Sequence, residues 1–512
     1  MEESHEYLKK ITTGAGLVFI GLLISKLFGY FYRVVVARMG TEQYGTLSLS
    51  IAVFGILSMI SLVGINEGIV RYVSYYQGKG DEKKLKEIYY SALKIGIPLS
   101  ILFGIFLFIF SKDIALGIFK DPNLTILLKI LAIAVPLDVI RTIFLSTMTG
   151  FQKIKYTVYS REILENVSKL ILTIILLILG FGLMGAVSAY VIAILLSLIL
   201  SFYFLEKKVF SFSKLKDKLV RYNSELLNYS WPLLFVGILV YVMTWTDTFM
   251  IGYFKTTSDV GIYNAAVPTA LLLYVIPVAF MTLFFPVITT AYAKDDKQTF
   301  YSIYKTITKW IFMINLIILI IFIIFSKQII QIIFGADYTA AWIPLILLSI
   351  GNFIYFLFRG TERILLVINR TRLVFLNFLI GGILNIALNY FLIPKYGING
   401  AALATASSFI VISIVLFIQS LVLTKINPFK KVYLKIILSS LIAVSLIYFL
   451  KEYLKLNIFI LILLTVLFII FYLFMLLITK SFDKEDIMII EFIQEKLRIR
   501  LPFIERIIKR FL

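Results

Sequence analysis

Apolar stretches of about 20 residues recur along the whole chain, separated by short polar segments. A helix of that length crosses a hydrocarbon core of about 30 Å, so each stretch is a candidate membrane span. No soluble domain of useful size fits between the stretches. The pattern predicts an all-α polytopic membrane protein with about fourteen transmembrane helices, at residues 11–32, 44–66, 88–110, 124–149, 157–180, 184–205, 228–250, 260–290, 306–326, 340–366, 372–393, 398–423, 433–450 and 457–479.

Composition supports the membrane interpretation. Hydrophobic residues make up 60% of the 512 residues, against roughly 45 to 50% in soluble globular domains. The first apolar run has no small-residue cleavage site, so we expect a retained helix rather than a removed signal peptide. The absence of cysteine excludes disulfides and thiolate metal sites.

Lysine and arginine are concentrated in every second loop. The loops predicted to lie inside carry 26 of these residues and the loops predicted to lie outside carry 9. Because such residues accumulate on the cytoplasmic side, both termini are predicted to be cytoplasmic, in a cell (cytoplasmic) membrane. The net charge of +21 then reflects topology and attraction to anionic lipids. Nucleic-acid binding is not expected, because no folded domain is left to provide it.

A charged amphipathic segment follows the last predicted span. From Asp483 to Leu512, apolar residues recur at helical spacing opposite charged ones. We interpret it as a helix lying on the cytoplasmic leaflet. A helix that docks a partner protein is the alternative.

Short segments recur in the second half of the chain at a nearly constant offset. GLMGAVSA at residues 182–189 matches GINGAALA at 397–404, an offset of 215, and the turn at Gly45 matches the turn at Gly261, an offset of 216. A third match, GFQKIKY with VINRTRL, has an offset of 217. The repeat predicts two six-helix lobes, parallel because six is even, around a central cavity. The predicted domains are the lobes 1–210 and 211–426, helices 13 and 14 at 427–480, and the amphipathic helix at 481–512.

The segments ISKLFGYFYR, ARMGTEQYGTLSLS and GINEGIVRYVS, with DTFMIGYFKTTSDVGIYNAA at residues 247–266, carry a family resemblance. The chain resembles the polysaccharide transporter branch of the multidrug/oligosaccharidyl-lipid/polysaccharide (MOP) exporter superfamily, the Wzx-like flippases. The resemblance implies an alternating-access flippase for a polyprenyl-(di)phosphate-linked oligosaccharide, used in cell-surface polysaccharide or glycoconjugate synthesis, where other glycan-assembly proteins would be its partners. An anionic head that crosses hydrocarbon would need a cationic cavity.

Several charges lie inside predicted spans, where each costs roughly 3 kcal/mol and usually faces a cavity or a partner. Lys26 is the first candidate for cargo contact, although its long stem could also reach the outer headgroups. Arg33 is equally suited to interfacial anchoring. The candidate substrate-binding residues are Lys26, Arg33, Arg71, Asp138, Arg141, Arg359 and Arg363.

Two of these residues have possible partners on their own helix. Glu67 precedes Arg71 by four positions, a spacing that permits a structural ion pair or a gate. Asp138 precedes Arg141 by three. If Asp138 neutralises Arg141 the pair is scaffold, whereas pairing with Lys26 or Arg33 would allow a change of protonation during transport.

The resemblance also suggests a coupling cation, Na⁺ or H⁺. In the related lipid II flippases, an acidic residue on helix seven and polar residues on helices eleven and twelve can form a sodium site. The matching residues here are Asp247, Asn385, Asn389 and Thr405, and their oxygens suit a hard cation. Hydrogen bonds between helices are the alternative explanation.

Enzymatic functions find little support. His5 is the sole histidine and no phosphate-binding loop of the G-x-x-x-x-G-K-[ST] type occurs, so neither a Ser/His triad nor ATP hydrolysis is expected. A lipid II-type flippase and a MATE-type drug/cation antiporter remain alternatives within transport. A membrane glycan polymerase or ligase is the alternative outside transport, and the short outer loops argue against it. Helix eight contains Pro268, Pro277 and Pro286, which predict a kink or a moving gate.

Overall fold

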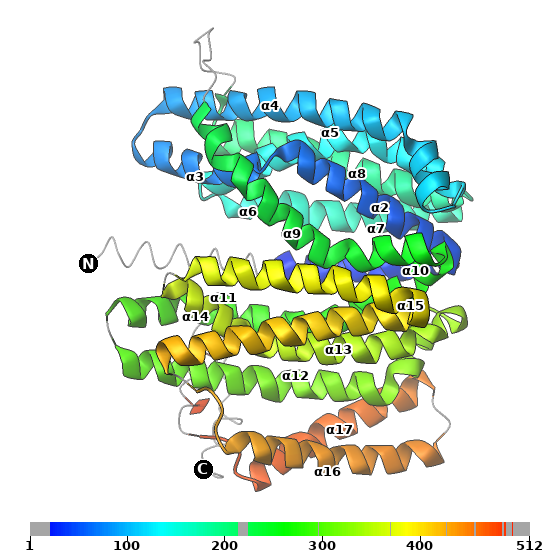
Figure 1. Ribbon diagram of the computed structural model, residues 1–512, viewed down its shortest axis with the longest axis vertical. Coiled ribbons are helices and arrows are strands. Elements are labelled where there is room, and N and C mark those ends of the chain that lie inside the picture. Colours follow the sequence, from blue (N-terminus) through cyan, green and yellow to red (C-terminus); the bar gives the residue numbers. More distant parts are fainter. Residues whose placement is uncertain are drawn as a thin grey trace. The chain divides into compact units, whose positions relative to one another are not determined.

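The computed structural model describes residues 21–212, 224–294, 296–368, 370–425, 427–454, 457–483, 486, 487 and 494. Within these ranges the regular structure is helical throughout (Figure 1). Eleven helices are long and apolar enough to cross a membrane. One of them, α15 (Thr371–Thr424), holds two spans that meet at Gly397. With the helix at residues 21–37 and the segment α6–η2–α7, the described chain has fourteen spans, as predicted; residues 11–20 of the first predicted span lie outside the described residues.

The remaining elements keep close to the predicted boundaries. They are α2 (Thr41–Leu62), α3 (Ile65–Gly78), α4 (Glu82–Ile109), the π-helix η1 (Asp113–Ile118), α5 (Asn123–Gly150), α6 (Ile154–Thr157), the π-helix η2 (Val158–Glu165), α7 (Asn166–Ile178), α8 (Gly182–Phe204), the π-helix η3 (Leu205–Val209), α9 (Ser224–Phe254), α10 (Thr257–Ala270), the 3-10 helix η5 (Leu271–Tyr274), α11 (Val275–Ala293), α12 (Lys297–Ile333), the 3-10 helix η6 (Ala336–Ala341), α13 (Trp342–Leu357), α14 (Arg359–Val367), α16 (Val432–Tyr453) and α17 (Ile458–Ile478). The amphipathic helix predicted at 481–512 lies almost wholly outside the described residues.

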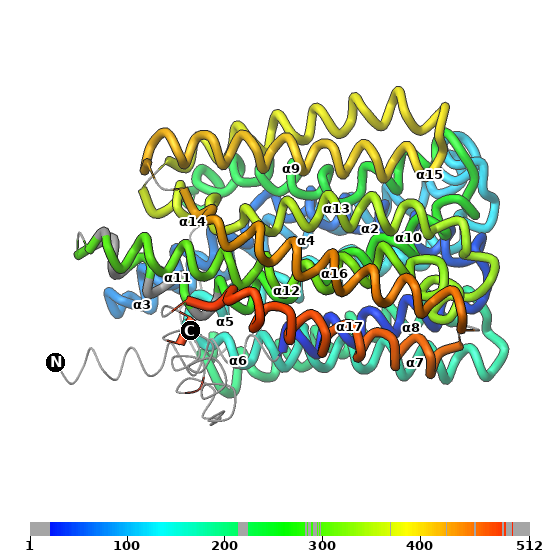
Figure 2. The backbone as a smooth tube through the Cα atoms, turned by 90° about the horizontal axis from the view of Figure 1, so that it is seen from below, coloured from blue at the N-terminus to red at the C-terminus, as the bar shows by residue number. Residues whose placement is uncertain are grey.

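The chain divides into two compact units. The first contains residues 1–268 and 382–404, and the second contains residues 269–381 and 405–512. Within each unit long helices run side by side, as α4 and α5 do in the first and α12 and α13 in the second (Figure 2). The first unit includes α9 and most of α10, so this division follows packing rather than the predicted repeat. The lobe boundaries at residues 210 and 426 stay a prediction.

Polar caps and helix breaks fall where the sequence pattern changes. Asp81 accepts from the backbone N–H of Lys84 at 2.9 Å and begins α4, and Asp296 accepts from Thr299 at 3.0 Å and begins α12. Backbone hydrogen bonds from Thr299 lower the pKa of the Asp296 carboxyl. The break predicted in helix eight is confirmed, because the 3-10 helix η5 separates α10 from α11 just after Pro268.

Repeat-related glycines both have a positive φ. Gly182 begins α8 with φ 51°, and Gly397 interrupts α15 with φ 57° and ψ −135°. Residues with a side chain rarely adopt the combination found at Gly397, so glycine is favoured at that turn. The similar φ values give the sequence repeat a structural counterpart.

The repeated turns at Gly45 and Gly261 pack directly against each other inside the first unit. A Cβ on Gly45 would overlap the carbonyl oxygen of Thr257, and a Cβ on Gly261 would overlap that of Thr41. The hydroxyls of Thr41 and Ser258 form a hydrogen bond of 2.7 Å. The contact is reciprocal, since each turn offers a glycine to the backbone of the other. Small residues four apart permit this close approach between membrane helices.

We expect Gly45→Ala to lower the free energy of unfolding by about 1–3 kcal/mol, because the added methyl forces the first turns of α2 and α10 apart. The measurement is thermal unfolding of the purified protein in detergent. Gly78→Ala is the control, since nothing lies within 4 Å of a Cβ at that position. Equal unfolding midpoints for the two variants would contradict the close contact.

Candidate functional site

Arg141 is a buried cation at the centre of the first unit. It lies on α5, its side chain is 6% exposed, and its guanidinium pairs with Asp138 one turn earlier on the same helix. It also pairs with Glu165, the last residue of the π-helix η2. The sequence allowed Asp138 to pair either with Arg141 or with Lys26 or Arg33, and in the structure it pairs with Arg141. Two carboxylates on one guanidinium offset the cost of burying its charge.

The π-helix η2 places Glu165 against α5. Residues Val158–Glu165 form this wider turn between α6 and α7. π-helical turns are rare and often occur at functional sites. Asn166, the next residue, donates its side-chain N–H to Ser25 Oγ at 3.1 Å and so connects α7 to the helix at residues 21–37.

Lys169 lies one turn further along α7 and is only 9% exposed. Its Nζ donates to Asn166 Oδ1 at 3.0 Å and lies 5.0 Å and 5.4 Å from the ring centres of Tyr32 and Tyr190. In the described part of the chain, no carboxylate is within ion-pair distance of Lys169. An amide oxygen and two aromatic faces therefore stabilise the ammonium, but no carboxylate neutralises it.

The helix at residues 21–37 brings Lys26 and Arg33 to the same region. The ammonium of Lys26 interacts electrostatically with Arg33 and Glu162. That of Lys169 interacts in the same way with Arg33, Arg141 and Glu162. We call the set the cationic cluster: it consists of Lys26, Arg33, Asp138, Arg141, Glu162, Glu165 and Lys169. The structure thus joins four of the predicted residues and adds three that the sequence analysis missed, all on the fifth span.

Arg71 has a different partner from the one expected. Its guanidinium lies over the ring of Tyr229 on α9, 4.1 Å from the ring centre, while Glu67 accepts a hydrogen bond from Asn66 at 3.3 Å. Glu67 and Arg71 form no ion pair in the described chain. The correction has a physical reason, because α9 presents an aromatic face on which a weakly hydrated guanidinium stacks. Nearby, Tyr76 donates to Glu225 at 3.0 Å, and burial raises the pKa of Tyr76 to about 12.

The second unit has its own arginine between tyrosines. Arg359, at the start of α14, donates to the Tyr355 hydroxyl at 3.1 Å and lies 3.5 Å from a Glu362 carboxylate oxygen. Its guanidinium also lies 5.6 Å from the ring centre of Tyr274. Arg363 is one turn further along α14 and partly buried.

The candidate coupling residues form a buried polar group in the first unit. Asp247 on α9 accepts from the Tyr263 hydroxyl of α10 and from Asn389 Nδ2 of α15, the latter at 2.7 Å. Asn389 Nδ2 also donates to Asn385 Oδ1 at 3.1 Å. Within the described chain, Asn389 Oδ1 is buried and accepts no hydrogen bond. The side-chain atoms of this group that could bind a cation are all oxygens, which a hard cation prefers. Tyr263 belongs to the group and was missed by the sequence analysis. Thr405 belongs to the second unit.

Comparison with known sequences decides the family. A model of the polysaccharide biosynthesis protein family matches residues 11–292, more than half of the chain. The chain belongs to this family. A model of the MatE family matches residues 232–391, and together the matches place the protein in the MOP superfamily of transporters. This family member is a multi-pass membrane transporter and not an enzyme.

Curated relatives come from archaea and bacteria. "Probable low-salt glycan biosynthesis flippase Agl15" of Haloferax volcanii is 29% identical over 199 residues, which are 39% of this chain and 42% of that protein. "Putative O-antigen transporter" of Shigella flexneri is 23% identical over 395 residues, which are 74% of this chain and 92% of that protein. The chain therefore aligns with less than half of the first relative and almost all of the second.

Solved structures share the fold. "Lipid II flippase MurJ, inward closed conformation" has a TM-score of 0.73 and 20% identity, over 90% of this chain and 97% of that chain. A MOP superfamily transporter from Pyrococcus furiosus has a TM-score of 0.59 and 15% identity, over 80% and 94%. At such identities the likeness concerns the fold alone. The expected family and the expected all-helical architecture are confirmed for this transporter.

Proposed function

We propose that this protein is an alternating-access flippase that moves a polyprenyl-(di)phosphate-linked oligosaccharide across the cytoplasmic membrane, with both termini in the cytoplasm. One observation carries the proposal: Lys169 is buried within a span and no described carboxylate pairs with it. Two of the three charged groups that act on it, Arg33 and Arg141, are also cations. Because Arg141 is paired with two carboxylates, Lys169 and Arg33 are the cations that a phosphate group of the cargo would complement.

The charges divide into two roles. Arg141 is held by Asp138 and Glu165, so it serves as scaffold and keeps the π-helix in place. Lys169 and the exposed Lys26 have no ion-pair partner among the described residues and are the groups that would meet the cargo. A lysine ammonium suits this task, because its donors rotate to follow a moving phosphate. The positive cluster favours an anionic cargo over the cationic cargo of a drug/cation antiporter, and the names of the glycan flippase and O-antigen transporter relatives support the same choice.

We expect Lys169→Gln and Lys26→Gln each to slow translocation at least tenfold, because each removes a cation that would balance the phosphate. The assay follows a fluorescent polyprenyl-diphosphate oligosaccharide in proteoliposomes through quenching by an impermeant reductant. Lys169→Arg should retain much of the rate.

Lys112→Gln is the matched control, since Lys112 is exposed and lies outside the cluster. Wild-type rates for Lys169→Gln would remove the proposal that this lysine meets the cargo. Equal losses in Lys112→Gln would show that general surface charge, rather than the cationic cluster, governs the rate.

The buried polar group around Asp247 is the proposed site of the coupling cation, Na⁺ or H⁺. A cation can use the Asp247 carboxylate and the unused Asn389 Oδ1, provided that the Tyr263 hydroxyl turns away. Since Asp247 is the one carboxylate of this group, the same residue would bind a proton or a sodium ion. Either cation would break hydrogen bonds that now join α9, α10 and α15 and would form contacts of its own with Asp247. Binding would therefore favour one conformation of these helices over another.

We expect Asp247→Asn to abolish the dependence of translocation on an imposed Na⁺ or H⁺ gradient, because the amide does not take up a proton at neutral pH and lacks the negative charge that would hold Na⁺ in a buried site, while cargo binding persists. Asp337→Asn, at an exposed position in η6, is the control. The measurement compares flipping rates with and without each gradient. Unchanged gradient dependence in Asp247→Asn would overturn the assignment of the coupling site.

A further inference from the structure

The short helix α3 has one buried face and one polar face. Ile65 and Ile69 are fully buried in the core of the first unit. Glu67, Arg71 and Tyr75 recur at the spacing of one helical turn on the opposite side, and all three are exposed. α3 lies beside the beginning of α9 in the same unit (Figure 1).

Helix lengths place this polar face outside the hydrocarbon. α2 has 22 residues and, at about 1.5 Å per residue, is about 33 Å long, which already crosses a core of about 30 Å. Gly64 then packs on Ser230 of α9, and Tyr76 donates to Glu225, so α3 runs along α9 toward the first turn of that helix. The polar face therefore lies at the level of the headgroups and the water beyond them, which is the cytoplasmic side in the proposed topology.

Arg71 presents a fixed guanidinium on this face. The guanidinium lies over the Tyr229 ring at 4.1 Å from the ring centre, and Tyr229 in turn meets the Tyr72 ring edge to face, with the ring centres 5.7 Å apart. Stacking orients the planar fork of an arginine while its outward N–H groups can still donate. Since Arg71 is exposed, those groups can donate to a bound molecule.

Acceptors and a further aromatic ring lie on the same helix. Asn66 donates to Glu67 at 3.3 Å, so an amide and a carboxylate lie side by side. Tyr75 is 51% exposed, and Lys79 Nζ is 4.5 Å from its ring centre. We call the whole set the α3–α9 surface: it consists of Asn66, Glu67, Arg71, Tyr75, Lys79, Glu225 and Tyr229.

The chemistry of this surface suits a sugar. Sugar hydroxyls both donate and accept hydrogen bonds, so amide, carboxylate and guanidinium groups can all bind them. The C–H groups of a sugar ring form an apolar face that packs on aromatic side chains. The two acidic residues of the surface offset its two basic residues, Arg71 and Lys79. Its net charge therefore favours a neutral ligand, whereas the cationic cluster favours an anion.

We propose that the α3–α9 surface binds the oligosaccharide part of the cargo on the cytoplasmic side, while the cationic cluster meets the phosphate. The inference rests on the proposed function, because it takes a lipid-linked glycan as the cargo. An anionic lipid headgroup is the competing occupant at this depth. The balanced charge of the surface disfavours that occupant.

The experiment measures the affinity of the full chain in detergent for three fluorescent probes. They are the polyprenyl-diphosphate oligosaccharide of the translocation assay, a polyprenyl diphosphate of the same chain length without sugars, and phosphatidylglycerol. The test variants are Tyr75→Ala and Arg71→Lys. Tyr453→Ala is the matched control, because Tyr453 is an exposed tyrosine of the second unit. Lys169→Gln reports separately on the cationic cluster.

We expect Tyr75→Ala and Arg71→Lys each to weaken binding of the oligosaccharide probe about five- to tenfold, because they remove an aromatic contact and a planar donor fork. Both variants should bind the sugar-free polyprenyl diphosphate as the wild-type protein does, which also shows that they are folded. Arg71→Lys keeps the positive charge, so its loss reports on the sugar contact. Tyr453→Ala should change neither affinity, and Lys169→Gln should weaken both polyprenyl probes alike.

Three results would overturn the inference and leave the proposed function standing, provided that Lys169→Gln still weakens both polyprenyl probes. One is wild-type affinity of Tyr75→Ala and Arg71→Lys for the oligosaccharide probe. Another is equal weakening of both polyprenyl probes by Arg71→Lys, since the arginine would then act on the diphosphate. The third is a loss of phosphatidylglycerol binding alone, which would assign the surface to lipid. A wild-type protein that binds neither polyprenyl probe would contradict the proposed function itself, and this inference with it.

Discussion

A charge inside an apolar span must find a partner, and this constraint organises the first unit. Arg141 meets it with two carboxylates, one from its own helix and one from the π-helix η2. Lys169 meets it with an amide oxygen and two tyrosine rings, which lower the cost of burial but supply no opposite charge. The same constraint thus yields a cation paired with two carboxylates at α5 and a lysine without a described carboxylate partner on α7. The second of these gives the protein something to offer an anionic cargo.

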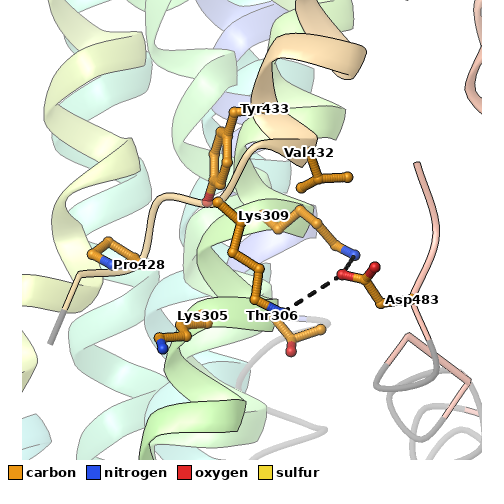
Figure 3. A pocket seen from close by; sticks show the side chains of 8 residues that line it. Lys305, Thr306, Lys309, Pro428, Val432, Tyr433 and Asp483 are labelled. Carbon is orange, nitrogen blue, oxygen red and sulfur yellow. Dashed lines mark hydrogen bonds and ion pairs between the residues drawn. The ribbon is translucent and has the colours of Figure 1, made fainter. Parts of the chain in front are cut away.

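The polar group at Asp247 and the ion pairs of Lys309 show the constraint in other forms. Asp247 accepts hydrogen bonds from neutral donors on two helices, α10 and α15. Lys309 on α12 is neutralised by Asp483 (Figure 3) and Asp486, which follow α17. At each site a buried or half-buried charge takes part in contacts between helices. A ligand that binds the charge therefore changes those contacts and so the packing of the helices.

Features that depend on local pattern were predictable from the sequence. The spans follow from runs of apolar residues. The turns at Gly45 and Gly182 have repeat partners in Gly261 and Gly397, where close packing at the first pair and a positive φ at the second favour glycine. The pair of Asp138 with Arg141 follows from a spacing of one helical turn. Features that join distant segments were not predictable. Glu165 and Lys169 gave a signal only as charges on the fifth span, and nothing local indicated the π-helix or the stacking of Arg71 on Tyr229.

The central claim is that Lys26 and Lys169 face a path that the cargo head uses. The chain has no native cysteine, so single cysteines at positions 26 and 169 can be tested with an impermeant thiol reagent in right-side-out and inside-out vesicles, with a cysteine at position 112 as a surface reference. Our account predicts labelling of both positions from at least one side, and protection by a polyprenyl-diphosphate oligosaccharide. Labelling at 112 with none at 26 or 169 from either side would contradict it.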